Sequence, residues 1–496
     1  MISEARSNYA REHALLLGAI ALGLMLRMVM GWQAPLWLDE TYTAVIANQQ
    51  TAADLYGWMR RELSGPVFYG LAWLVAQMAG LSDFALRVPS LLFALAAVLL
   101  VAWRGHDDMR VRLVWAALLA LWWPGVFQAS QARPQALLIF LAVLQAIAFL
   151  RAWKANDARW TWTWAGATTL MLLTHIYAAV PSGLMFLALA WSVRHRWRVQ
   201  ASALAAFVPV SIWYAAQIPF YLSFARPGVA SYPPLGLGDV LTFAPDLLGG
   251  TPTVAWVTLT LAGGLTLMAF LDRRRTGGGR LVLSGEAVLA LCGIAAALMI
   301  FSVGMIRPSY VPRYMVPCVP AVLLGITMAL LRAQGDWRRA LKFTIVLAIL
   351  QAILLGSLAF PKSKQREIYT LEFQQASDWL MRGGPDRPVI FTWDHPVAAV
   401  NPDANLIEVG GFFFERAGHP RQVIVQRPPS GRHAAPVLAD AVRTHRADLI
   451  WIGDRKWPKA LMRAEGLECR LWHRKGYSRS IACRYLGGTR TILTAN

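Results

Sequence analysis

The chain has 496 residues, of which 56% are hydrophobic and only 15% are charged. A soluble domain carries roughly 25% charged residues, so this composition excludes an ordinary cytosolic protein. The long apolar runs exclude a disordered chain. The net charge of +20 is typical of the basic loops that fix the topology of a membrane protein, and we therefore expect no nucleic acid partner.

Eleven apolar segments have about the length that a helix needs to cross roughly 30 Å of hydrocarbon. With the N-terminus inside, the inside loops hold 19 Lys and Arg and the outside connections hold six, a strong positive-inside signal. The first segment is expected to stay uncleaved, because no small-residue cleavage site follows it. The sequence thus predicts an all-α polytopic membrane domain over residues 1–360, with spans at 13–31, 84–103, 111–128, 134–151, 160–175, 178–193, 200–219, 253–271, 285–305, 314–331 and 340–360.

One further apolar segment, Pro66–Ala79, is left out of this topology. It is short, and Gly65 and Gly70 interrupt its start. As a full span it would invert every later loop and put the basic clusters outside, against the positive-inside rule. We interpret it as a re-entrant or interfacial helix in the first outer loop, although twelve spans also fit hydropathy alone.

From about Pro361 the long apolar runs end, and short β-rich pieces alternate with helical stretches. This alternation predicts a soluble α/β domain over residues 361–496, and eleven spans put it outside. The expected strands are Val389–Thr392, Gln422–Gln426 and Asp448–Gly453, and the expected helices lie near 368–382, 436–446 and 456–465.

The four cysteines fall into two pairs with different expectations. Cys469 and Cys483 lie in the segments Leu467–His473 and Arg479–Tyr485, at equal distances from Gly476. A hairpin that turns at Gly476 would place them opposite one another, and an oxidising outer compartment favours a disulfide. The other two, Cys292 and Cys318, lie in predicted spans and are expected to be packing residues.

Polar side chains from segments far apart in the sequence collect at the outer ends of the predicted spans. Polar residues at membrane depth are the informative ones in a membrane protein. They are Arg27 near the end of the first span, Asp39, Glu40 and Tyr42 in the first outer loop, Gln131 and Arg133 between spans three and four, His175 between spans five and six, and Arg307, Tyr310, Arg313 and Tyr314 between spans nine and ten.

This set of residue types suits work on a phosphate at the membrane face. Asp39 and Glu40 could supply a general base or oxygen ligands for a divalent ion. Arginines with tyrosine hydroxyls could hold a phosphate, and His175 could bind phosphate, a metal or a reacting hydroxyl. Taken singly, each has an ordinary explanation: a solvated Asp-Glu turn, an Arg27 that reaches the headgroups, a satisfied interfacial histidine. The hypothesis of a lipid-linked phosphate substrate depends on their convergence.

These motifs resemble the GT-C superfamily of integral-membrane glycosyltransferases, in particular the bacterial relatives of protein O-mannosyltransferases and lipid A aminoarabinose transferases. Leu36–Tyr42 is similar to the first-loop pattern whose acidic residue is the catalytic base. Two positions depart from the family: Ser64-Gly65 replaces a His before the prolines, and Gln131 replaces a Glu. The resemblance covers roughly residues 15–330, and its later motifs are Phe84–Ser90, Gln131–Ala136, Leu173–His175 and Arg313–Pro317.

The resemblance implies an inverting glycosyltransferase of the bacterial inner membrane, with its site and its carboxyl-terminal domain on the periplasmic side. A polyprenyl-monophosphate sugar would be the donor, and a glycan, lipid or protein would be the acceptor. Asp39 would be the base, and Glu40 would orient it. An optional Mg²⁺ or Mn²⁺ would take Asp39, Glu40 and His175 as ligands. The donor phosphate would be held by Arg313, Tyr314, Arg133, Arg307, Tyr310 and Arg27.

Three other functions fit parts of the sequence. A polysaccharide ligase that uses a diphosphate carrier would share the outer-face arginines. A transporter or flippase of lipid-linked sugars is disfavoured, because no Asp or Glu lies in the middle of a predicted span. In a third, non-catalytic alternative, the outer domain is a binding module on a membrane scaffold.

Overall fold

The chain forms two compact units in the computed structural model. The helical unit comprises Met1–Trp32, Glu62–Ile218 and Tyr232–Pro361, and the sheet unit comprises Gln33–Arg61, Pro219–Ser231 and Lys362–Asn496. The sheet unit thus includes the chain that follows the first helix as well as the carboxyl-terminal residues. The structure describes residues 2–29, 36–62, 64–155, 157–192, 201, 203–224, 235–249, 252–275, 284–307, 310–332, 345–346, 348–349, 353, 373–383, 385–394, 398, 401–427, 433–453, 458–473 and 479–487.

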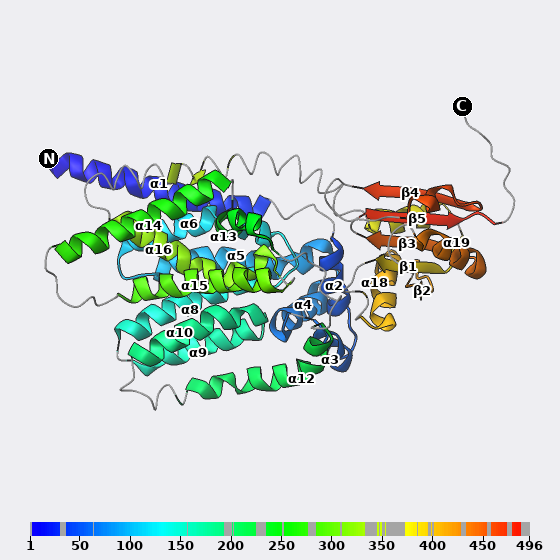
Figure 1. The fold of residues 1–496 in the computed structure, drawn as a ribbon, viewed down its shortest axis with the longest axis horizontal. Coiled ribbons are helices and arrows are strands. Elements are labelled where there is room, and N and C mark those ends of the chain that lie inside the picture. Colours follow the sequence, from blue (N-terminus) through cyan, green and yellow to red (C-terminus); the bar gives the residue numbers. More distant parts are fainter. Residues whose placement is uncertain are drawn as a thin grey trace. The chain divides into compact units, whose positions relative to one another are not determined.

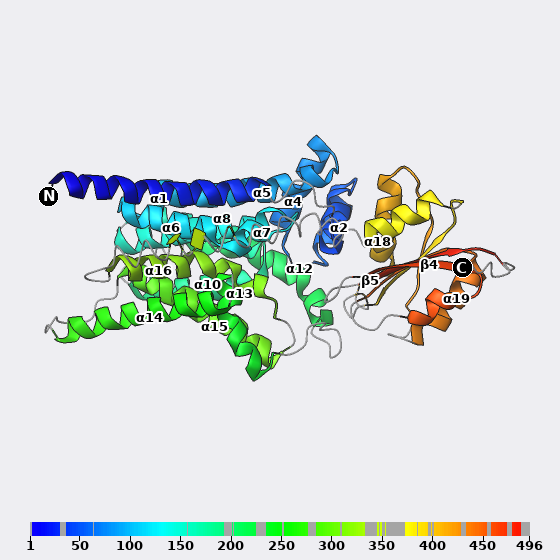
Figure 2. The same cartoon turned by 90° about the horizontal axis from the view of Figure 1, so that it is seen from above.

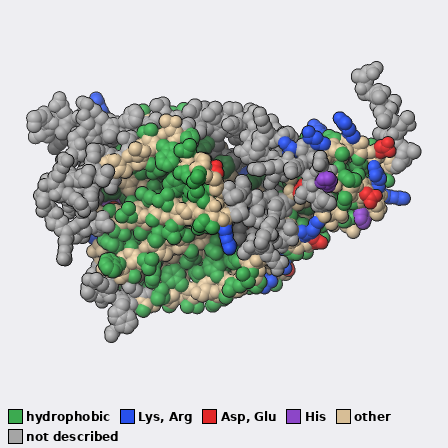
Figure 3. Space-filling view, viewed as in Figure 1, with side chains coloured by type: hydrophobic (Ala, Val, Ile, Leu, Met, Phe, Trp, Pro, Cys, Tyr) green, Lys and Arg blue, Asp and Glu red, His purple; other side chains and the backbone are tan. Residues whose placement is uncertain are grey.

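The helical unit is a bundle in which α8, α9, α10 and α15 lie side by side as near-parallel rods (Figures 1 and 2). Hydrophobic side chains cover much of the face that Figure 3 shows. Its helices are α1 (Ile2–Val29), α4 (Pro66–Ala79), α5 (Asp83–Arg104), α6 (Met109–Leu121), α7 (Trp123–Ala129), α8 (Gln135–Lys154), α9 (Ala158–Leu172), α10 (Ala179–Ser192), α12 (Val208–Phe224), α13 (Phe243–Leu248), α14 (Pro252–Arg275), α15 (Gly285–Ile306) and α16 (Val319–Arg332), with 3-10 turns η1 (Ile176–Ala178), η3 (Leu204–Phe207), η4 (Leu237–Thr242) and η5 (Pro312–Cys318). The residues of α12 from Pro219 onward are assigned to the sheet unit.

Six helices among the described residues are long and apolar enough to cross a membrane, and α6 with α7 forms a seventh if the bent pair is one span. The protein is therefore a multi-pass membrane protein. The expected span at 111–128 is broken: α6 and α7 are bent by 64° relative to one another. Trp122 between them is extended, and Pro124 stands in the first turn of α7, where its missing N–H is tolerated. The expected span at 340–360 lies almost entirely outside the described residues.

Helix α4 begins and ends at one face of the bundle. Gly65 N–H donates to the Thr174 carbonyl at 2.8 Å, so α4 begins at the α9–α10 turn. Ser90 in the second turn of α5 donates to the Arg133 carbonyl at 3.0 Å, so α5 begins at the α7–α8 turn. These two turns lie on the same face, because the antiparallel helices α8 and α9 separate them. Since α5 starts only a few residues after α4 ends, α4 has not crossed the bundle.

The sheet unit contains a five-stranded mixed sheet in the order β2-β1-β3-β5-β4. Strand β1 pairs in parallel with β2 and β3, and β5 pairs antiparallel with β3 and β4. The strands are β1 (Val389–Asp394), β2 (Val423–Val425), β3 (Asp448–Gly453), β4 (Leu467–His473) and β5 (Arg479–Tyr485), and the helices are α2 (Leu38–Ala47), α3 (Ala52–Met59), α18 (Asp403–Arg416), α19 (Ala434–His445) and the 3-10 turn η8 (Lys459–Arg463). The predicted class, an all-α membrane domain with a soluble α/β domain, is confirmed.

Alternating side chains on β1 and β3 bury both faces of this sheet. Ile390, Leu449 and Trp451 pack in one cluster with residues of α19. Phe391, which points to the opposite face, lies against Gly410 of α18. Figure 2 shows α18 and α19 on opposite sides of the sheet. Helix α18 was not predicted from the sequence, and it contacts α2.

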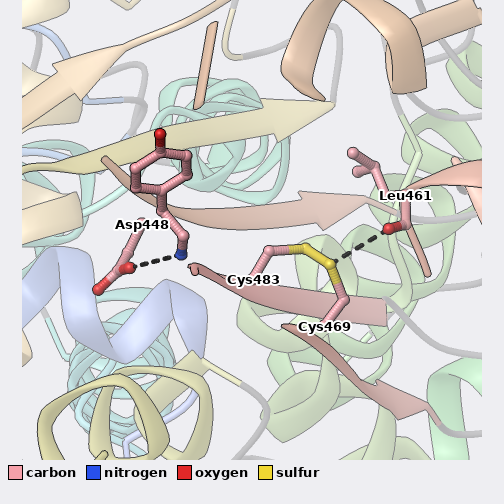
Figure 4. The surroundings of a disulfide bond; sticks show 5 residues. Asp448, Leu461, Cys469 and Cys483 are labelled. Carbon is pink, nitrogen blue, oxygen red and sulfur yellow. Dashed lines mark hydrogen bonds between the residues drawn. A yellow bond between two sulfur atoms is a disulfide. The ribbon is translucent and has the colours of Figure 1, made fainter. Parts of the chain in front are cut away.

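The register of β4 and β5 places Cys469 opposite Cys483, as their symmetric spacing predicts. The two sulfurs form a disulfide (Figure 4). The Sγ of Cys469 lies 3.3 Å from the Leu461 carbonyl oxygen, and on the same strand as Cys483 the Tyr485 N–H donates to buried Asp448 at 3.1 Å. The turn around Gly476 lies outside the described residues.

Candidate active site

The predicted site residues fall into two groups, one in each unit. Asp39, Glu40 and Tyr42 belong to the sheet unit, and the remainder belong to the helical unit. Each unit therefore supplies its own chemistry: carboxylates in the first, cations and aromatic rings in the second. The second group is Arg27, Gln131, Arg133, His175, Arg307, Tyr310, Arg313 and Tyr314.

The two adjacent carboxylates lie in the first turn of α2, where negative charge is favourable because the helix dipole is positive there. Glu40 Oε2 accepts a hydrogen bond from the Trp37 N–H at 3.3 Å, and its side chain is only 1% exposed. Asp39 is half-buried. Glu40 thus fixes the start of the helix, and Asp39 is the more exposed of the two carboxylates.

Tyr42 lies one helical turn after Asp39 and is held by two aromatic neighbours. Its ring centroid is 6.2 Å from that of Trp58 on α3 and 5.7 Å from that of Trp393 on β1. The ring is buried, so Tyr42 packs α2 against the sheet. The face of α2 that carries Asp39 is therefore fixed by packing.

A histidine and two tyrosines form one cluster in the helical unit. Tyr177 and Tyr314 stack with ring centroids 4.2 Å apart and an interplanar angle of 10°. The His175 ring lies 5.3 Å from Tyr314, and its Nδ1 accepts the Tyr177 N–H at 3.3 Å. The cluster joins the α9–α10 turn to η5. Tyr177 was not among the predicted site residues, although it follows His175 by only two positions.

Two of the predicted arginines lie near this cluster. Arg313 and Arg133 are close enough for their positive charges to act on the His175 imidazole, and both side chains are half-buried. Gln131, two residues before Arg133, is buried. Its backbone carbonyl accepts a hydrogen bond from the Arg133 N–H at 2.8 Å. The structure thus brings together four of the predicted residues: His175, Arg133, Arg313 and Tyr314.

Two further glutamines near the α7–α8 turn were missed by the sequence analysis. Gln128 and Gln135 are buried, and their Oε1 atoms accept no hydrogen bond from the described residues. The sequence signal that could have found them is the occurrence of three glutamines in the eight residues 128–135, at the ends of two predicted spans. Their amide oxygens can accept hydrogen bonds from hydroxyl groups.

Tyr310 and Arg307 lie apart from the histidine cluster. The Tyr310 hydroxyl donates to Asp246 Oδ2 at 3.0 Å, and Thr242 donates to the same oxygen at 3.0 Å. Burial raises the pKa of Asp246, and the two hydrogen bonds oppose that shift. The hydroxyl of Tyr310 is thus engaged by a carboxylate, whereas Arg307 lies exposed at the end of α15.

Arg27 is almost completely buried, and its guanidinium donates to backbone carbonyls. Nη1 donates to Gly23 and Ala120, and Nη2 donates to Leu119 at 2.9 Å. The last two carbonyls belong to the end of α6, where no further helical turn can satisfy them. Arg27 therefore stabilises the α6–α7 break, and its assignment to a lipid phosphate stays a prediction.

No three His, Cys, Asp or Glu side chains within the described ranges are grouped so that they could hold a metal ion. Asp39 and Glu40 belong to one unit and His175 to the other, and Glu40 and His175 already accept main-chain hydrogen bonds. The proposed ligand set stays a prediction.

Comparison with known proteins gives matches to solved structures but none by sequence. No protein-family model and no curated protein sequence matches the chain. The structure of ArnT from Cupriavidus metallidurans in the apo state matches with a TM-score of 0.57 and 13% identity, over 96% of this chain and 98% of ArnT. The chain has the ArnT fold. The structure of ArnT bound to undecaprenyl phosphate matches with a TM-score of 0.53 and 14% identity, over 95% and 97% of the two chains. The GT-C resemblance of the motifs and the ArnT fold agree.

Proposed function

We propose that the protein is a glycosyltransferase that takes a sugar from a polyprenyl-monophosphate donor and transfers it to an acceptor hydroxyl. The observation that carries the proposal is the match, over nearly the whole of both chains, to ArnT bound to undecaprenyl phosphate. The carboxylate pair in the first turn of α2 adds the chemistry that such a reaction needs. We propose the bacterial inner membrane as its location, with the site on the periplasmic side.

In the proposed reaction Asp39 removes the proton of the acceptor hydroxyl. The acceptor oxygen forms a bond to the anomeric carbon as the bond from that carbon to the phosphate oxygen breaks, with inversion. The polyprenyl phosphate leaves with the negative charge. Arg313, Tyr314 and Arg133 stabilise that charge where it develops, and Arg307, Tyr310 and Arg27 are further candidates.

Glu40 has a supporting part in this proposal. Its hydrogen bond from Trp37 N–H fixes the helix turn that carries Asp39, so it orients the base. A Mg²⁺ or Mn²⁺ ion held by Asp39, Glu40 and His175 would add positive charge near the leaving phosphate. Product formation that is lost with EDTA and restored by either ion would support this optional ligand set.

The second candidate is a ligase that uses a diphosphate carrier, which the arginines near His175 would also suit. The carrier that is consumed separates the two functions. A mass spectrum that shows free polyprenyl monophosphate as the product lipid supports transfer from the monophosphate, whereas release of polyprenyl diphosphate supports the ligase.

Replacement of Asp39 by Asn tests the proposal. We expect product formation to fall by about 10²–10⁴-fold, the contribution of a general base, while expression and undecaprenyl phosphate binding stay normal. The measurement is mass spectrometry of surface glycans and lipids from cells that carry the wild-type protein, the variant or no protein. Asp54→Asn, an exposed carboxylate in the same outer segment, is the matched control. Near-normal turnover of Asp39→Asn would sink the assignment.

A further inference from the structure

Glu408 of α18 links helices α2 and α3, which lie in the segment 38–61. Its Oε2 accepts a hydrogen bond from Gln49 Nε2 at 2.7 Å and another from Trp58 Nε1 at 3.1 Å. Gln49 follows the end of α2, and Trp58 lies in the last turn of α3. One carboxylate oxygen of the carboxyl-terminal domain therefore holds both helices at once.

Two other contacts extend this attachment along the segment. Arg61 donates to Asn405 Oδ1 at 3.0 Å, and Asn405 lies one turn before Glu408 on α18. The Tyr42 ring packs on Trp393 of β1. The segment 38–61 is thus attached to the carboxyl-terminal domain near its beginning, at the α2–α3 connection and at its end.

These contacts decide the direction in which Asp39 points. Helix α2 has ten residues and α3 has eight, and helices this short are not stable in isolation. Their orientation must therefore come from tertiary contacts. A hydrogen bond in which one partner is ionised is stronger than one between neutral groups, so the two Glu408 bonds and the Arg61–Asn405 bond are the strong polar links between the segment and α18 that the described residues provide.

We propose that Glu408 is a positioning residue of the transfer reaction: through Gln49 and Trp58 it fixes α2, and so the direction of Asp39. The inference rests on the proposed function. It gives the carboxyl-terminal domain a part in building the active site, in contrast to a separate binding module. Glu408 itself touches no reacting atom in this proposal.

The experiment compares Glu408→Ala and Glu408→Gln with Glu415→Ala in the full-length protein. Glu415 is exposed on the same helix and makes no contact with segment 38–61 in the contacts described above, so it is the matched control. Three quantities are measured: hydrogen exchange of peptides within residues 38–61, sugar transfer in membranes, and binding of undecaprenyl phosphate alone.

We expect Glu408→Ala to raise exchange in residues 38–61 and to lower transfer by about 10- to 100-fold, since small misplacements of a catalytic group have effects of this size. Undecaprenyl phosphate binding should stay unchanged, because its proposed ligands lie in the helical unit. Glu408→Gln should recover most of the activity, because its amide oxygen still accepts both hydrogen bonds. Glu415→Ala should behave as the wild type.

Three results would overturn the inference: wild-type exchange in Glu408→Ala, raised exchange with wild-type transfer, or a parallel loss of undecaprenyl phosphate binding. Failure of the proposed function looks different. If Asp39→Asn is inactive and Glu408→Ala is fully active, the inference alone fails. If the wild-type protein transfers no sugar from a polyprenyl phosphate, the proposed function itself fails.

Discussion

At the scale of single residues, the stacked tyrosines hold in place the backbone of an arginine that we propose to bind the donor phosphate. Tyr314 is buried, stacks on Tyr177 and lies against His175. Arg313 precedes it on η5, a 3-10 turn with Pro312 at its start. Because the ring of Tyr314 cannot move without losing both contacts, the backbone that carries Arg313 is held in place before substrate arrives. Such preorganisation is the basis of electrostatic catalysis.

Arg313→Ala should weaken binding of undecaprenyl phosphate more than it affects the acceptor. A hydrogen bond to a charged group contributes about 1.5–3 kcal/mol, which corresponds to roughly a 10- to 150-fold loss of affinity. Titration of the purified variant with undecaprenyl phosphate measures the effect, and Arg416→Ala, an exposed arginine of α18, is the control. Unchanged affinity would move the phosphate site to Arg133 or Arg307.

The sequence predicted the type of residues at the site better than their partners. His175, Arg133 and Arg313 were predicted from their place at span ends, and the structure brings them near one another. The engagement of Tyr310 by Asp246 was not predictable, because 64 residues separate the two. Ser64-Gly65 stands where the GT-C motif has a His before the prolines, and the structure gives a physical reason for the glycine. A Cβ at Gly65 would lie 2.0 Å from the Leu173 carbonyl oxygen, so only glycine allows the two backbones to come this close.

At the scale of elements, the α6–α7 break is one place where the structure differs from the sequence prediction. Hydropathy predicted one span over 111–128, because periodicity carries no information about a bend. The local signal was Trp123-Pro124-Gly125, since a proline removes a helical hydrogen bond. Gly125 leaves room for the Arg27 guanidinium and the Trp122 ring. The β4–β5 hairpin, by contrast, was predictable, because symmetric spacing alone fixes its register.

Arg27→Met should destabilise the helical unit. The substitution keeps most of the apolar stem but removes the side-chain donors to the buried carbonyls of Leu119 and Ala120 at the end of α6. The Gly23 carbonyl, inside α1, keeps the backbone N–H of residue 27 as its helical partner. Each buried acceptor left unsatisfied costs about 1–3 kcal/mol. Thermal unfolding of the purified protein in detergent should show a lower Tm than the wild type.

The control for Arg27→Met is Arg112→Met, an arginine that donates to the carbonyl of exposed Trp103. Its Tm should stay close to that of the wild type. An unchanged Tm in Arg27→Met would mean that the break is held by helix packing alone, and Arg27 would then be free for the phosphate role expected from the sequence.

At the scale of the whole molecule, the contacts of Glu408 restrict the topology. Residues 38–61 directly follow the first helix and are bound to α18, so they lie on the same side of the membrane as the carboxyl-terminal domain. The chain must then cross the membrane an even number of times between Arg61 and Phe373. The expected spans from 84–103 to 314–331 number nine, so an even number requires one more span, either 340–360 or Pro66–Ala79. Because α4 begins and ends at one face of the bundle, we expect 340–360 to be the tenth span. Hydropathy alone could not decide this, because the deciding contact joins residues 350 positions apart.

We expect residues 38–61 and the carboxyl-terminal domain both to be periplasmic. Cysteines introduced at exposed Gln50 and exposed Asp440 should both react with a membrane-impermeant maleimide in spheroplasts, and neither should react in sealed inverted vesicles. The wild-type protein is the control, because Cys292 and Cys318 are buried and Cys469 and Cys483 are bonded. Labels on opposite sides would mean an odd number of crossings between the two positions: either Pro66–Ala79 crosses the membrane as well as 340–360, or neither segment does. Labels together on the inner side would keep the even number of crossings but invert the positive-inside assignment, and the proposed transfer would then take place at the cytoplasmic face.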